Sequence, residues 1–207
     1  MEAAREFGVR VIGPNCLGLM RPGRKINATF SRNSALPGHL ALVSQSGAIC
    51  TAILDWAEDQ RIGFSLVASV GDAADVDFGD ILDFLALDPE TRSILLYVEG
   101  IRSARSFMSG LRAAARMKPV IVIKSGRHAE GSRAAMSHTG AMVGADDVFD
   151  AALERAGAVR AQTVQQMFSA ASILSSGVRV RGSRLAIITN AGGPGVMATD
   201  RAVELDV

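Results

Sequence analysis

Cysteine is scarce in this sequence, with Cys16 and Cys50 alone among 207 residues. The two are far apart and form no Cys-x-x-Cys pair, which argues against a disulfide framework or a metal site and fits a reducing cytoplasm. Aromatic residues make up only 5% of the chain, and they do not alternate with basic residues as in single-strand nucleic-acid binders. The formal net charge of +1 gives no electrostatic reason to expect binding to nucleic acid or to an anionic membrane.

Long apolar runs and an export signal are also lacking. No apolar run approaches the ~20 residues that cross a bilayer, and no basic-then-apolar leader opens the chain. Hydrophobic residues nevertheless make up 48% of the sequence, as in α/β proteins whose parallel strands are buried on both faces. Residues 2–7 read as the middle of a helix and the last residues follow a helical pattern, so we expect a piece of a longer protein.

Strand and helix patterns alternate through the central part of the sequence. Expected strands cover residues 40–43, 64–69, 93–98, 119–123 and 158–160. Expected helices follow the turn at 44–47, cover residues 79–87, begin after Ser103, cover residues 146–156 and begin after Thr163; Gly157 is expected to end the fourth of them. Because such alternation implies right-handed crossovers, we predict an α/β fold: a doubly wound, flavodoxin-like sheet of five parallel strands in the order 2-1-3-4-5.

Shorter segments flank this central part. Before it, residues 9–12 have a buried-strand pattern, a Gly/Pro/Asn turn follows at 13–18, and residues 21–38 show no periodicity and are expected to be a linker. After it, residues 185–189 are expected to form a strand that leads through a glycine-rich loop at 190–195 into a helix.

Polar loops follow four of the predicted strands and should meet in space. These loops are residues 44–47, 70–72, 99–100 and 124–139. In an open parallel sheet the carboxyl ends of the strands share one edge, and ligands bind there. We therefore expect these four loops, distant in sequence, to line one edge of the sheet.

His138 is the candidate reactive group at this edge. It lies between Ser137 and Thr139, with Gly140 beyond them. Glu99 ends a buried strand at the same predicted edge, and a carboxylate bonded to one ring nitrogen leaves the other free as a nucleophile. Considered alone, His138 could be an ordinary loop residue. Considered alone, Glu99 could be a solvated residue at the end of a strand.

Two strand–loop–helix turns carry exposed backbone N–H groups suited to phosphate. The first contains Ser44, Ser46 and Gly47, and the second contains Asn190, Gly192 and Gly193. Neither turn matches the Walker or the full dinucleotide fingerprint. An acidic loop at residues 72–77 is explained by turn formation and helix capping, so no metal site is assigned.

These motifs together resemble the NDP-forming acyl-CoA synthetases, the superfamily of succinyl-CoA synthetase and ADP-forming acetyl-CoA synthetase. The resemblance rests on GPNCLG at 13–18, NATF at 27–30, SQSGA at 44–48, Glu99-Gly100, SHTGA at 137–141 and ITNAGGPGVMATD at 188–200. It implies three domain pieces: the tail of a CoA-binding Rossmann domain and a linker (1–30), a succinyl-CoA-ligase-like flavodoxin domain (37–177) and the start of the following ligase domain (183–207).

The resemblance also implies a reaction. In this family a histidine, matched by His138, carries phosphoryl between an acyl phosphate and a nucleoside diphosphate, while the residue matched by Glu99 orients it. The two glycine-containing turns, with Thr139 and Gly140, would hold the phosphoryl group. Asn15 and Cys16 would lie near the CoA thiol. Thr51 stands where succinyl-CoA synthetases carry an aromatic residue, which argues against succinate as the acid.

The implied ligands are CoA, ADP or ATP and phosphate, with Mg expected beside the nucleotide on an ATP-grasp domain or subunit that this chain lacks. The chain alone is therefore expected to be inactive, and the whole protein is expected to be an oligomer. An alternative is a non-catalytic acyl-CoA-sensing module of a GNAT-type lysine acetyltransferase, suggested by ILDWAEDQ at 53–60 and IGFSLVASVGD at 62–72. A flavin-binding domain is disfavoured, because Trp56 and Tyr97 are predicted to pack inside the fold.

Overall fold

The computed structural model describes residues 1–127, 145–178, 182 and 184–207. It divides into two compact units, Met1–Ser176 and Gly177–Val207. The first unit is built on a seven-stranded sheet in the order β2-β1-β4-β3-β5-β6-β7. The strands are β1 Gly18–Arg21, β2 Ile26–Thr29, β3 Pro37–Ser44, β4 Phe64–Ser69, β5 Ser93–Val98, β6 Val120–Lys124 and β7 Val159–Ala161.

The five strands from β3 onward are parallel and follow the predicted order. β3 pairs with β4 and β5, β5 with β6, and β6 with β7. Numbered from β3, this is 2-1-3-4-5, so the flavodoxin-like topology is confirmed. Their residues form near-continuous apolar runs, as expected for strands with helices on both faces; Ala41, Leu42 and Val43 of β3 are all 0% exposed.

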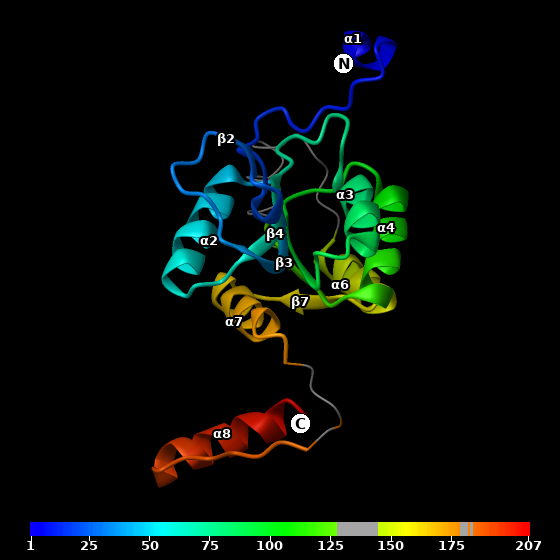
Figure 1. The fold of residues 1–207 in the computed structure, drawn as a ribbon. Coiled ribbons are helices and arrows are strands. Elements are labelled where there is room, and N and C mark those ends of the chain that lie inside the picture. Colours follow the sequence, from blue (N-terminus) through cyan, green and yellow to red (C-terminus); the bar gives the residue numbers. More distant parts are fainter. Residues whose placement is uncertain (128–144, 179–181, 183) are drawn as a thin grey trace. The chain divides into compact units, whose positions relative to one another are not determined.

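Two helical layers cover the sheet (Figure 1). On one face lie α2 Gly47–Asp59 and α7 Val164–Ser175. On the other lie α3 Phe78–Leu87, α4 Ala104–Met117 and α6 Asp146–Ala156. The described part of the first unit also contains the helix α1 Glu2–Glu6 and the 3-10 turn η1 Pro22–Arg24. Each layer has its own apolar core. The prediction that Trp56 packs inside the fold is confirmed, since its ring stacks on that of Phe168 with 4.3 Å between the ring centroids.

Local capping explains where the helices begin and end. Ser46, Ser103 and Thr163 each accept a hydrogen bond from the backbone N–H three residues ahead, as expected of N-cap residues. Gly157 ends α6 with a φ of 79°, a left-handed conformation that glycine adopts without strain. Asp77 caps α3 reciprocally with Asp80, so at this position the acidic loop is explained by helix capping.

Two sequence predictions about the N-terminal flank are wrong. Residues 21–38 are not an unstructured linker, since β2 pairs antiparallel with β1, and β1 in turn pairs antiparallel with β4. Residues 9–12 form no strand. They lie along the loop after β4 instead, where Val76 N–H donates to Val11 O at 3.1 Å and Val11 N–H donates to Asp75 at 2.7 Å.

The second unit contains α8 Gly192–Glu204. The strand predicted at residues 185–189 is absent from the described part of this unit. A strand needs a neighbour to accept its backbone hydrogen bonds, and the apolar side chains here are exposed, with Ile188 at 97%. No helix in the described part of the chain is long and apolar enough to cross a bilayer.

Candidate functional site

The turn from β3 into α2 is tied together by two serine hydroxyls. Ser44 Oγ accepts from Ser46 N–H at 3.0 Å and donates to Ser46 O at 2.8 Å. Ser46 Oγ accepts from Ile49 N–H at 3.3 Å and caps the helix. Ser44 is 0% exposed, so its hydroxyl shapes the turn, while Ser46 and Gly47 line an adjoining pocket. The N-terminal amides of α2 give this pocket a wall of partial positive charge.

Gln45 connects this turn to Glu99. Its side-chain Oε1 accepts from the backbone N–H of Glu99 at 2.6 Å and from that of Gly100 at 2.9 Å. The backbone N–H of Gln45 donates to Tyr97 O at 3.2 Å. Gln45 is 6% exposed and Glu99 is 7% exposed. The end of β5 is therefore held at a fixed place beside the N-terminus of α2.

Tyr97 shares the environment of Glu99. Burial raises the pKa of the Tyr97 phenol, a hydrogen bond with Ser125 acts in the opposite direction, and the Glu99 carboxylate raises the pKa further. The phenol is thus neutral near pH 7 and able to donate a hydrogen bond. Glu99 consequently lies at the junction of β3, β5 and the loop that follows β6.

The turn that contains Asn15 and Cys16 packs against the loop after β4. Asp72 N–H donates to Pro14 O at 3.0 Å, and Asn15 Nδ2 donates to Asp72 Oδ1 at 3.3 Å. Gly71 makes this approach feasible, because a Cβ atom there would lie 2.2 Å from Pro14 O. The predicted convergence is therefore confirmed for the loops after β3, β4 and β5, and the turn at 13–16 joins them.

A pocket of about 470 Å³ opens between this turn and α2. Its wall comprises Asn15, Cys16, Leu17, Phe30, Gln45, Ser46, Gly47 and Ala48. A second pocket of about 630 Å³ shares Cys16, Leu17 and Phe30 with it. Thr51 does not line either pocket; its hydroxyl donates to Gly47 O at 3.1 Å. The site thus places the N-terminal end of a helix beside a half-buried thiol and an exposed aromatic ring.

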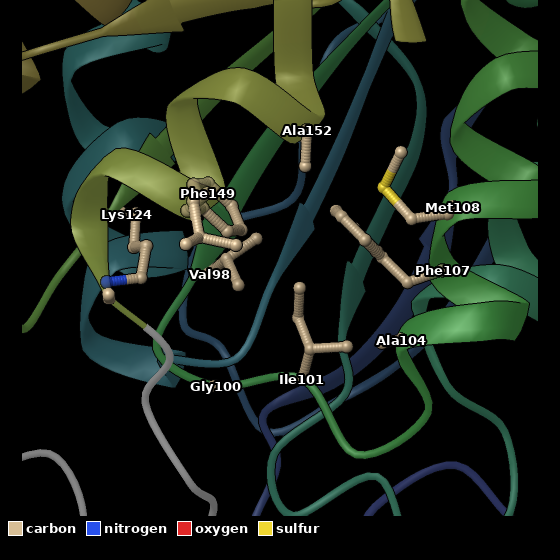
Figure 2. A pocket seen from close by; sticks show the side chains of 11 residues that line it. Val98, Gly100, Ile101, Ala104, Phe107, Met108, Lys124, Phe149 and Ala152 are labelled. Carbon is tan, nitrogen blue, oxygen red and sulfur yellow. The ribbon is translucent and has the colours of Figure 1, made fainter. Parts of the chain in front are cut away.

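An apolar cavity of about 300 Å³ lies on the other face of β5 (Figure 2). Val98 and Gly100 line it from β5 and its end, and Phe107 and Phe149 line it from α4 and α6. Lys124 supplies its only charged side chain among the described residues. Burial lowers the pKa of this ammonium, while the Asp146 carboxylate acts to raise it.

The remaining predicted site residues lie outside the described residues or in the second unit. His138, Thr139 and Gly140 lie outside the described residues. Asn190, Gly192 and Gly193 belong to the second unit, where they are exposed at the start of α8. There Thr189, rather than Asn190, organises the turn, since its hydroxyl accepts from Ala191 N–H at 3.1 Å.

Sequence reasoning missed two contributors. Gln45 lies inside the SQSGA motif, but the motif alone does not indicate that its amide reaches a strand 54 residues away in sequence. Phe30 ends the NATF motif, and its place in both pockets depends on the unforeseen β1–β2 pairing. In the described part of the chain no three His, Cys, Asp or Glu side chains gather in a way that could hold a metal ion.

The fold and the site define a flavodoxin-like domain with a pocket at the carboxyl edge of its sheet, lined by the N-terminus of a helix. Residues 37–174 match the family model described as the succinyl-CoA ligase like flavodoxin domain. The chain therefore belongs to this family.

Curated relatives and solved structures agree. The chain is 46% identical over 204 residues to the alpha subunit of ADP-forming acetate–CoA ligase I from Pyrococcus furiosus, which covers 99% of this chain and 44% of the relative. It is 41% identical to ADP-forming 4-hydroxybutyrate–CoA ligase from Nitrosopumilus maritimus, covering 97% of this chain and 29% of the relative. The chain thus spans less than half the length of these relatives.

A similar solved structure is acetyl-coenzyme A synthetase 1 from Ca. Korarchaeum cryptofilum in complex with phosphate and ADP. Its TM-score to this chain is 0.92 at 38% sequence identity, covering 98% of this chain and 44% of that one. The predicted resemblance to NDP-forming acyl-CoA synthetases is confirmed. The acetyltransferase fusion stays a prediction.

Proposed function

We propose that this chain is part of an NDP-forming acyl-CoA synthetase. The reaction interconverts acyl-CoA, ADP and phosphate with the free acid, ATP and CoA. The domain assignment proposed with it is the end of a CoA-binding Rossmann domain (1–30), the flavodoxin-like domain (37–177) and the start of the next ligase domain (183–207). The activity requires the remaining domains, including an ATP-grasp domain or subunit that binds nucleotide with Mg. Cysteine usage supports a cytoplasmic setting, and we expect the whole protein to be an oligomer.

His138 carries the phosphoryl group in this proposal. Phosphate first displaces CoA from acyl-CoA, which gives acyl phosphate and free thiol. A ring nitrogen of His138 then attacks phosphorus, the P–O bond to the acyl group breaks, and the acid leaves. ADP takes the phosphoryl group from phosphohistidine and becomes ATP. Glu99 orients the imidazole, and the N-terminus of α2, which begins at Gly47, stabilises the charge on the transferring oxygens together with the Ser46 hydroxyl.

The observation that carries the proposal is the Gln45 bridge between Glu99 and the start of α2. It holds the backbone of Glu99 at a fixed place beside the helix N-terminus that lines one pocket. A carboxylate and a helix N-terminus are the two supports proposed here for a phosphohistidine. Asn15 and Cys16 line that same pocket, which supports a thiol end of CoA bound there. Thr139 and Gly140, with Asn190, Gly192 and Gly193 at the start of α8, are proposed as further phosphate ligands.

The test uses the full-length gene product with acetyl-CoA, ADP and phosphate. Free thiol and ATP are measured together, and equal amounts of the two are expected. His138→Ala should abolish both products. His39→Gln is the matched control, because His39 lies at the start of β3 and contacts Glu90 O at 2.9 Å, away from the proposed site. ATP formation that survives in His138→Ala overturns the proposal.

Two further results separate the alternatives. CoA binding without any ATP formation in the wild-type protein would identify a non-catalytic sensing module instead. Replacing acetyl-CoA by succinyl-CoA should give a lower kcat/KM, since Thr51 takes the place of an aromatic residue in the succinate enzymes.

A further inference from the structure

Phe30 is a large apolar side chain at the boundary between two pockets. It follows β2 and is 78% exposed. The pocket of about 470 Å³ and the pocket of about 630 Å³ both include it in their walls, together with Cys16 and Leu17. A single exposed aromatic residue needs no explanation by itself, but a ring at the junction of two pockets contacts any molecule that extends through both.

The backbone, rather than the packing of the ring, holds Phe30 in this place. Its N–H donates to Leu17 O at 3.4 Å, one residue beyond the paired positions Gly18 and Thr29 of β1 and β2. The two strands approach closely because Gly18 has no side chain, since a Cβ atom there would lie 2.1 Å from Ala28 O. Removal of the exposed ring should therefore leave the fold intact.

The walls of both pockets are poor in charge. Among the described residues, no charged side chain lines the pocket of about 470 Å³. Arg10 is the one charged side chain that the described residues contribute to the other pocket, and its guanidinium is paired with Asp75 at 3.0 Å and with Asp80 at 3.1 Å. Because an unpaired charge is costly to remove from water, these walls suit the uncharged arm and the acyl group of an acyl-CoA better than its nucleotide phosphates.

The position of α2 indicates which pocket receives the acyl group. In the proposed reaction, phosphate attacks the thioester carbonyl carbon, so this carbon must face the N-terminal end of α2. Of the two pockets, the one of about 470 Å³ is lined by Ser46, Gly47 and Ala48 of that helix end. We name it the acyl pocket, and the larger one the arm pocket.

We propose that Phe30 is a specificity-determining residue whose ring forms the side wall of the acyl pocket and limits the bulk of the acyl group. The arm of CoA leaves through the arm pocket, and Cys16 and Leu17 lie beside the thioester where the two pockets meet. This inference rests on the proposed function.

The experiment compares two acyl-CoA substrates in the full-length protein, with ADP and phosphate present and ATP formation measured. Phe30→Ala removes an apolar contact from the small acetyl group and opens room for the branched isobutyryl group. The ratio of kcat/KM for isobutyryl-CoA to that for acetyl-CoA should therefore rise about tenfold, the low end of what small changes in an apolar pocket produce. A purely structural defect would lower both values equally and leave the ratio unchanged.

Two further variants make the comparison specific. Phe30→Tyr keeps the ring, and its hydroxyl can reach water at this exposed position, so it should keep the wild-type ratio. Phe84→Ala is the matched control, because Phe84 lies on α3, is 48% exposed and lines neither pocket. A ratio that rises in Phe30→Ala alone supports the inference. A wild-type ratio in Phe30→Ala, or an equal rise in Phe84→Ala, overturns it.

Binding measurements distinguish failure of this inference from failure of the proposed function. Isothermal titration gives the dissociation constants of acetyl-CoA and isobutyryl-CoA for each variant. If the wild-type protein binds acyl-CoA but forms no ATP, the proposed function fails, and the ratio of the two constants decides the role of Phe30. A shift of about tenfold toward isobutyryl-CoA in Phe30→Ala supports that role, and an unchanged ratio overturns it. A wild-type protein that binds neither compound overturns both proposals.

Discussion

Gln45 is the residue that links the turn between β3 and α2 to Glu99, and its truncation should affect both stability and rate. Gln45→Ala removes the acceptor from two buried N–H groups. Each N–H group left without an acceptor lowers the free energy of unfolding by up to about 1–3 kcal/mol. Without that acceptor the end of β5 shifts, so phosphohistidine formation should slow by about tenfold or more. Urea unfolding and rapid-quench labelling measure the two effects.

Gln60→Ala serves as the control for this substitution, because Gln60 ends α2 at an exposed position. It should leave both quantities near their wild-type values. A Gln45→Ala protein that labels at the wild-type rate would contradict the positioning role of Gln45.

The two cysteines should differ in reactivity. Burial raises the pKa of Cys50 to about 12, against a smaller opposite effect of Ser44. Thiolate is the reactive form, so native Cys50 should resist iodoacetamide at pH 8 and gain reactivity only as the pH rises toward 12. Cys16 is half-buried in the pocket wall and should be alkylated at pH 8, more slowly when CoA is bound. Mass spectrometry of the alkylated peptides distinguishes the two sites, and labelling of Cys16 that CoA leaves unchanged would contradict its assignment.

At the scale of single elements, helix ends were predictable and the flanking strands were not. Ser103, Thr163 and Gly157 act locally, through bonds to residues within one turn. Residues 9–12 and 185–189 carry equally good apolar patterns, but a strand also needs a partner, and that depends on the rest of the fold. Local sequence therefore indicates where a helix is capped, but it does not indicate whether a strand finds a partner.

The contact between α3 and α4 depends on glycine. A Cβ atom at Gly79 would lie 2.1 Å from Ser106 Oγ and 2.8 Å from the Ser106 carbonyl carbon. Helix propensity alone favours alanine by up to about 1 kcal/mol, yet overpacking costs typically about 1–3 kcal/mol. We therefore expect Gly79→Ala to lower the free energy of unfolding. Gly23→Ala is the control, because its nearest neighbour lies at an ordinary 3.5 Å; a Gly79→Ala protein as stable as wild type would contradict this packing.

At the scale of the whole molecule, the shared carboxyl edge of a parallel sheet predicted that the loops around Ser46 and Glu99 would meet. The alternation of strands and helices predicted the parallel sheet and its flavodoxin-like order. It could not predict β1 and β2, because their antiparallel pairing extends the sheet through a segment without periodicity. The bridge made by Gln45 was equally hidden, since it depends on the rotamer of one side chain between neighbouring strands.

The first compact unit should fold without the second. Both apolar cores lie within Met1–Ser176, so a chain that ends at Ser176 should keep its melting temperature. A chain that ends at Gln162 lacks α7 and the fully buried Met167. Loss of a core side chain of this size costs roughly 2–5 kcal/mol, which lowers the melting temperature by roughly 10 °C. Circular dichroism measures both transitions, and equal melting of the two chains would contradict the role of α7 in the core.

The most direct test of the proposed reaction is isolation of the phosphorylated protein. Full-length protein is mixed with acetyl-CoA and labelled phosphate, freed of small molecules and then given ADP. We expect an acid-labile label on the peptide that contains His138, and transfer of that label to ATP when ADP is added. Label that is stable to acid, that lies on another peptide, or that ADP does not remove would contradict a phosphohistidine at His138.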